Sequence, residues 1–270
     1  MCIRPIFCIG LFLLLYNNKS QAQNADETRA GKEIVLSTGF NNITIRDAFF
    51  SRQPFSGNLP VVRAKFARHG RLFSEEFMLS YSRGDLVNKI NANSKASCFF
   101  YEASISGLYN FSKSDDTKWK LQGGLGTHLL YNYRSYNSFI NNARSFDLSL
   151  PVTVLCSIER RCDPGSTGIH FKNMLSVSPF AFVSLPSYST ENPQGLINGA
   201  TGTKEIFNAA SFQSLPDYFF ISNILTGSKA LSRKSALGLQ YKWLYQNINA
   251  ARELRIATHQ LLLSYIYSFY

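Results

Sequence analysis

Few residues in this chain have the types and spacing that carry catalysis or bind metals. Its four histidines are His69, His128, His170 and His259, and no two of them have the spacing of a zinc-binding pair. The five cysteines include no Cys-x-x-Cys pair. The Gly-x-Ser-x-Gly motif of hydrolases and the Gly-x-x-x-x-Gly-Lys-Ser/Thr phosphate loop are also missing. The sequence therefore predicts no metal site, no cofactor and no phosphate-binding loop.

Composition narrows the class of protein further. Hydrophobic residues make up 45% of the 270 residues and charged residues only 17%, which argues against a disordered chain or a coiled coil. Lysine and arginine exceed aspartate and glutamate by 28 − 17 = +11. These basic residues are scattered, so we expect no nucleic-acid partner. Those near strand ends could meet anionic lipid headgroups or the phosphates of lipopolysaccharide.

Residues 1–22 have the organisation of a secretory signal peptide. Arg4 supplies the positive charge, residues 6–16 form a short apolar segment, and a small-x-small cleavage site ends at Ala22. The apolar segment is too short to span a bilayer. We expect cleavage after Ala22, followed by a short periplasmic tail over residues 23–32.

Export brings the cysteines into an oxidising compartment. Cys156 and Cys162 are close enough in sequence to close a short loop as a disulfide, and the spacing leaves open whether they do. Cys98 would stay unpaired, as a small apolar side chain on a strand.

From residue 33 onward the dominant pattern is a two-residue alternation of apolar and polar side chains, which is typical of β-strands. In residues 237–245 the apolar series is Leu237, Leu239, Tyr241, Trp243 and Tyr245. Several such stretches run for ten or more residues, the length that a tilted transmembrane strand needs. The pattern therefore predicts an all-β antiparallel transmembrane barrel over residues 33–270. A soluble sandwich or a lipocalin-like barrel, with the apolar face inside, is the alternative.

Ten strands account for the alternation. They are expected at 33–45, 61–69, 71–83, 96–111, 118–133, 144–157, 168–183, 216–226, 234–246 and 254–269. Twelve strands are the alternative if residues 184–215 contain a hairpin. Long and short connections alternate, as in barrels with long extracellular loops and short periplasmic turns. Glu75 conflicts with this scheme because it falls on the predicted lipid face.

The polar face of the predicted barrel would line its lumen. The candidate lumen residues are Glu102, Lys120, Gln122, His128, Asp147, His170, Lys172, Gln240 and Lys242. Barrels of about this size tend to be filled by side chains. If these charges pair across strands the lumen is plugged, whereas unpaired charges would leave a narrow pore that favours small anions.

The last strand carries a resemblance to a known class of protein. Its aromatic residues Tyr265, Tyr267 and Phe269 alternate with other side chains, and one residue, Tyr270, follows. This resembles the terminal β-signal of Gram-negative outer-membrane barrels, and the whole chain resembles uncharacterised barrels of Bacteroidetes. The resemblance implies an outer-membrane location, with the barrel assembly machinery and periplasmic chaperones as partners. It implies no activity.

Three functions follow, in order of preference. The first is a non-enzymatic barrel with a structural or binding role, whose extracellular loops contact a ligand that the sequence does not identify. The second is a narrow diffusion channel for small solutes, weakly favouring anions. The third is a barrel-embedded hydrolase. Omptin proteases use acidic pairs and a histidine at the extracellular rim, but Asp115 and Asp116 fall in a predicted periplasmic turn. No histidine has a serine two positions on, as outer-membrane phospholipases do.

Overall fold

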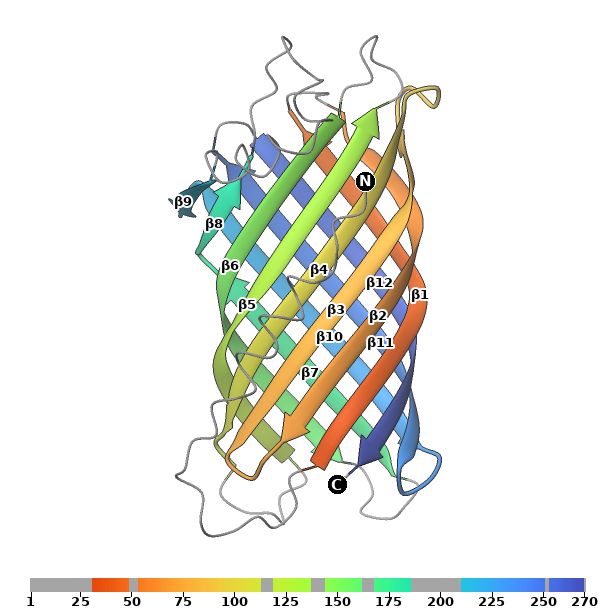
Figure 1. Ribbon diagram of the computed structural model, residues 1–270, viewed down its shortest axis with the longest axis vertical. Helices are drawn as coiled ribbons and strands as arrows, with labels where there is room; N and C mark the ends of the chain where they lie inside the picture. The colour runs from red at the N-terminus through yellow and green to blue at the C-terminus, as the bar shows by residue number, and fades with distance from the viewer. Residues whose placement is uncertain are drawn as a thin grey trace, which may run out of the picture.

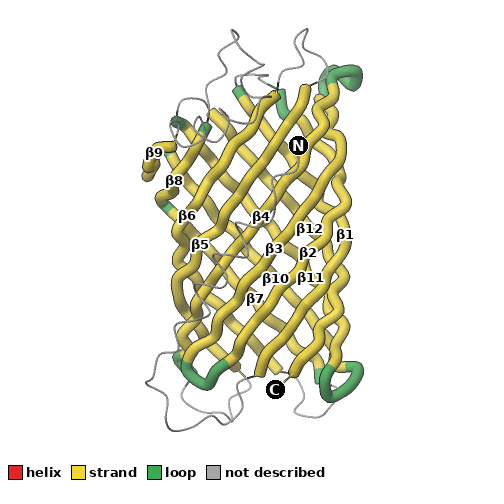
Figure 2. The backbone as a smooth tube through the Cα atoms, in the orientation of Figure 1, coloured by secondary structure: helices red, strands yellow, loops and turns green. Residues whose placement is uncertain are grey.

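The computed structural model describes residues 31–48, 53–112, 119–136, 144–161, 168–185, 210–250 and 253–269. All regular structure in them is β-strand (Figure 2). The strands are β1 (Gly31–Asp47), β2 (Phe55–His69), β3 (Phe73–Asn88), β4 (Lys95–Asn110), β5 (Trp119–Tyr136), β6 (Arg144–Arg161), β7 (Ile169–Ser178), β8 (Phe180–Ser184), β9 (Ala210–Ser214), β10 (Tyr218–Ala230), β11 (Ser235–Asn249) and β12 (Glu253–Phe269). No helix in the described residues is long and apolar enough to cross a membrane.

Ten of these strands close into an antiparallel barrel (Figure 1). The wall runs β5-β4-β3-β2-β1-β12-β11-β10-β7-β6, and pairing of β6 with β5 completes the ring. The first and last strands pair along their whole length, from Lys32 opposite Phe269 to Asp47 opposite Leu254. The ten-stranded antiparallel barrel predicted from the sequence is confirmed. The lower end is defined here as the end where β1 begins and β12 ends, and the upper end as the opposite one.

The predicted strand over residues 168–183 is interrupted. Val154 of β6 faces Val177 of β7, whereas Pro151 faces Ala181 of β8, so three steps along β6 match four along its partner. This is a β-bulge, and it lies at Pro179, which has no N–H for the ladder. Above the bulge β8 pairs with β9 at the side of the barrel (Figure 1). The two extra strands thus arise beside the wall, and the barrel itself has ten strands.

Most strands extend beyond their predicted ends, which changes the expected loop pattern. The strand expected at residues 61–69 begins earlier, at Phe55. Pro60 still pairs with Phe40 of β1, and the pairing with β3 is interrupted there. Apart from the segment between β8 and β10, the connections at the upper end are then about as short as those at the lower end. The predicted contrast between long and short connections was therefore wrong outside that segment.

The two faces of the wall have opposite chemistry. Large apolar side chains cover the outside on every barrel strand, for example Leu36, Leu125, Leu239 and Leu263, each more than half exposed. This excludes the soluble alternative, in which those side chains would form the core. Glu75 does face outward, close to the lower end and opposite Arg68 on β2, so the strand register agrees with the alternation.

A substitution by arginine on the outer wall should lower the free energy of unfolding strongly only at mid-height of the barrel. Leu261 is the middle residue of β12 and is 53% exposed. Leu261→Arg should lower the free energy of unfolding in lipid vesicles by about 2–4 kcal/mol. The matched control is Leu231→Arg in the lower β10–β11 turn, where the cost should be about 0–1 kcal/mol. Urea titrations of both variants would measure the difference, and equal costs would contradict a lipid-facing belt.

Candidate functional site: the interior of the barrel

The barrel interior is the part of the molecule with concentrated chemistry. All nine candidate lumen residues have their side chains on the inward side of the wall. They lie on five strands: Glu102 on β4, Lys120, Gln122 and His128 on β5, Asp147 on β6, His170 and Lys172 on β7, and Gln240 and Lys242 on β11. Among these nine residues, every buried charged side chain has an ion-pair partner on another strand.

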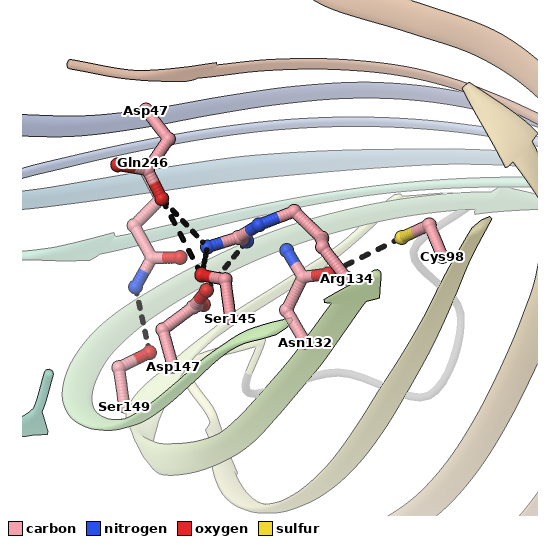
Figure 3. Close-up of polar contacts among 8 residues, drawn as sticks. All are labelled: Asp47, Cys98, Asn132, Arg134, Ser145, Asp147, Ser149 and Gln246. Atoms are coloured by element: carbon pink, nitrogen blue, oxygen red, sulfur yellow. Dashed lines mark hydrogen bonds and ion pairs between the residues drawn. The ribbon is translucent and has the colours of Figure 1, made fainter. Parts of the chain in front are cut away.

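The strongest cluster lies in the upper half, around Arg134 of β5 (Figure 3). Its guanidinium donates hydrogen bonds to Asp147 Oδ1 at 2.6 Å, to Asp47 Oδ2 at 3.1 Å and to Ser145 Oγ at 2.7 Å. The Arg134 side chain is fully buried, and both carboxylates are almost fully buried. Because a lone buried charge is costly, this cation needs the two anions around it.

Sequence reasoning missed Arg134 and Asp47. The strands expected at 118–133 and 33–45 end just before these residues, so both fell into predicted loops. The alternation did carry a signal, since Arg134 has the same parity as His128 and Asn132 on the inward face of β5. Asp47 likewise continues the inward series of Ile43 and Ile45 on β1.

Apolar side chains seal the upper half around this cluster. They belong to one buried group whose largest members include Phe100, Tyr136, Tyr218 and Phe220. Polar side chains in the same layer are paired: Cys98 Sγ donates to Asn132 Oδ1 at 3.3 Å, and Gln246 Nε2 to Ser149 Oγ at 2.6 Å (Figure 3). Rings and ion pairs together thus fill the cross-section of the upper half.

A second cluster lies at mid-height. The ammonium of Lys242 on β11 donates to both oxygens of Glu102 on β4, and His128 Nδ1 lies 3.2 Å from Glu102 Oε1. The side chains of Lys242 and Glu102 have no solvent exposure. Below them the Arg63 guanidinium of β2 donates to the side-chain oxygens of Gln240 and Gln260.

A third group of charges lies in the lower half. Glu76 of β3 binds the ammonium of Lys172 on β7 and lies 3.7 Å from that of Lys65 on β2. Glu159 on β6 and His170 on β7 are 2.8 Å apart. Between these groups and the middle cluster lies a cavity of about 40 Å³, enough for about three water-sized spheres.

The outer wall holds the remaining candidate residues. Tyr265 and Tyr267 are exposed on β12 near its lower end, and Tyr267 stacks on Phe269 with ring centroids 6.2 Å apart. Cys156 is exposed on β6. Its expected partner Cys162 lies outside the described residues, so the disulfide remains a prediction, as does the signal peptide over residues 1–22.

The fold and the filled interior define the class of this protein as a closed antiparallel barrel of the outer-membrane type. No protein-family model and no curated protein sequence matches the chain. Among solved structures, the outer membrane protease OmpT from Escherichia coli is similar in fold, with a TM-score of 0.58 and 8% identity over 92% of this chain and 99% of OmpT.

Two further solved structures are similar over most of their length. The transport unit of the autotransporter AIDA-I from Escherichia coli matches with a TM-score of 0.44 and 9% identity, over 99% of this chain and all of the other. Ail from Yersinia pestis matches with a TM-score of 0.37 and 8% identity, over 87% of this chain and 99% of Ail. At these identities the similarity concerns the fold alone.

Removing the Arg134 cation should strongly destabilise the barrel. In Arg134→Gln two buried carboxylates lose the guanidinium between them, which should lower the free energy of unfolding by about 3–5 kcal/mol. The control is Arg255→Gln, whose ion pair with Glu253 is exposed on the outer wall and should be worth no more than about 1 kcal/mol. Urea unfolding in lipid vesicles compares the two. Similar small losses would show that the cluster does not hold the upper half together.

Proposed function

We propose that this chain is an outer-membrane barrel with a closed lumen, and that its role is structural or binding rather than transport or catalysis. The observation that carries the proposal is the sealed upper half, where the Arg134 cluster and a layer of buried rings occupy the interior. A path for solutes would have to break buried ion pairs, which is costly. The surface would then make the contacts with other molecules, chiefly through the loops at the upper end.

The orientation of the barrel follows from its strand count. Because the number of wall strands is even, β1 begins and β12 ends at the same end of the barrel, the lower one, and we assign this end to the periplasm. The upper end then faces the outside, including the segment between β8 and β10. Export would use the signal peptide, with cleavage after Ala22. The outward-facing aromatic series Tyr265, Tyr267 and Phe269 would be recognised by the barrel assembly machinery, with periplasmic chaperones delivering the chain.

The diffusion channel, the second hypothesis, has less support. A channel of that kind needs an unpaired cationic lining, whereas the described inward-facing charges of the upper half are paired.

 The cavity in the lower half is only about 40 Å³, and buried rings cap it from above. A solute could enter from the lower end but would find no open route to the upper one.

A hydrolase, the third hypothesis, has no histidine at the upper rim to support it. All four histidines are described, and none lies there: His69 and His170 pair with carboxylates in the lower half, and His128 is buried at mid-height. His259 faces outward from β12 and contacts the Tyr241 hydroxyl at 2.7 Å. Asp115 and Asp116 lie outside the described residues. OmpT is a protease, but the shared fold does not extend that activity to this chain.

Lipid is the partner that the outer wall supports. A groove of about 270 Å³ on β3, β4 and β5 is lined by Tyr81, Arg83, Phe99, Tyr101 and Tyr133. Arg83 is exposed in the upper half and has no ion-pair partner among the described residues. A cation beside aromatic rings at this height suits the phosphate and acyl chains of lipopolysaccharide.

Conductance tests the closed lumen. Folded protein, identified by a band that shifts on boiling in electrophoresis, should give no discrete current steps in planar lipid bilayers. Lys120→Ala, which removes an inward charge of β5, should leave this result unchanged. Regular steps in the wild type, with an ion selectivity that Lys120→Ala alters, would establish the channel instead.

The lipid groove makes a separate prediction. Arg83→Gln should reduce the lipopolysaccharide that stays bound to the purified native barrel by about fivefold, since one basic residue near a membrane surface contributes about 1 kcal/mol. Arg255→Gln is the control because that arginine is already ion-paired with Glu253 on the outer wall. Phosphate analysis of the purified proteins measures the bound lipid. Equal amounts in both variants would rule out the groove as the binding surface.

A further inference from the structure

The cavity in the lower half is surrounded by more cations than anions. Arg63 and Lys65 of β2 and Lys172 of β7 line it, whereas Glu76 is its lining carboxylate. Glu76 is already engaged by both lysines, through a hydrogen bond from Lys172 and a 3.7 Å contact with Lys65. The lining therefore has a formal excess of 3 − 1 = +2 charges.

Arg63 is the group that this arrangement leaves uncompensated. Its side chain is 5% exposed, and it donates to the neutral amide oxygens of Gln240 and Gln260. Among the described residues no carboxylate lies within ion-pair distance of it. The next carboxylate up the barrel, Glu102, is bound by Lys242. Arg63 Nε is also buried and has no hydrogen-bond partner, so a buried charge and a buried donor both lack a directly bound anion.

We propose that this cavity binds a small tetrahedral oxoanion, phosphate or sulfate, held by Arg63 with Lys65 and Lys172. An arginine fork matches the oxygens of such an anion, and ammonium groups add point charges. The hydroxyl groups of Ser104, Ser106 and Thr226 also line the cavity and can donate further hydrogen bonds. Space for about three water-sized spheres is the size of one such anion and excludes a larger ligand.

The anion would enter from the lower end. Above the cavity lie the Glu102–Lys242 pair and the buried rings of the upper half. Below it the nearest ion pairs, Glu33 with His69 and Glu159 with His170, are partly exposed. Binding therefore needs no open pore, and it is independent of whether the barrel conducts.

The first test is calorimetric titration of the folded barrel in a neutral detergent with sodium sulfate, at constant ionic strength maintained with sodium chloride. We expect saturable binding to the wild type with one site per chain. Arg63→Gln should weaken the affinity about tenfold or more, because it removes the charge-assisted hydrogen bonds. Arg63→Lys should retain part of the affinity, and the outer-wall variant Arg255→Gln should retain all of it.

A second measurement locates the anion without any substitution. Crystals of the wild type soaked in selenate should show an anomalous selenium peak beside Arg63, and the measurement stands even if Arg63→Gln fails to fold. Sulfate affinities that are equal in wild type and Arg63→Gln would overturn the proposal, as would wild-type protein that shows no saturable binding. A selenate soak with no peak in the cavity would overturn it as well. A conductance result of either kind leaves these outcomes unchanged.

Discussion

Closure of the sheet is the constraint on which the rest of this structure depends. In a lipid bilayer every backbone N–H and C=O group must be satisfied within the protein, and an open sheet has two edges where they are not. Here β1 pairs with β12 over its whole length, and β5 pairs with β6. The ring therefore presents no free edge in its wall, and the side-chain alternation along each strand assigns one face to the outside and one to the lumen.

Closure of a ten-stranded ring also makes the lumen narrow, so many inward charges are removed from water. Because a buried charge without a partner is costly, several of them pair across the barrel. Glu102 and Lys242 lie on β4 and β11, and Glu76 and Lys172 on β3 and β7. Each such pair joins strands that are not neighbours in the wall. Removal of one partner is costly for that reason, although the net stability of a buried pair over an apolar filling is small.

The faces of the strands could be predicted from the sequence because a period of two maps directly onto the two sides of a sheet. The series Leu237, Leu239 and Tyr241 faces outward for this reason, with Gln240 and Lys242 inward. The pairing could not be predicted, since which inward side chains meet depends on the closure and stagger of the whole barrel. The exact ends of the strands could not be predicted either.

Arg134 and Asp47 illustrate the error in the predicted strand ends. Both lie at the upper ends of their strands, one or two residues beyond the ends expected at 45 and 133. A polar side chain on the inward face does not end a strand in a barrel with a polar interior, because the apolar requirement applies to the outer face alone. The break at Pro179 has another cause, a missing backbone donor. Beyond the resulting bulge β8 stays paired with β6, and its other edge pairs with β9.

The two halves of the interior differ, and the difference explains how a polar lumen can coexist with a closed barrel. In the upper half, rings such as Phe100 and Phe220 surround the Arg134 cluster and exclude water. In the lower half the cavity is lined by Arg63 and Lys65. An apolar layer that stays dry is a barrier to ions even when it is thin. The lower half can therefore be hydrated from one end and hold an excess of positive charge without creating a leak across the membrane.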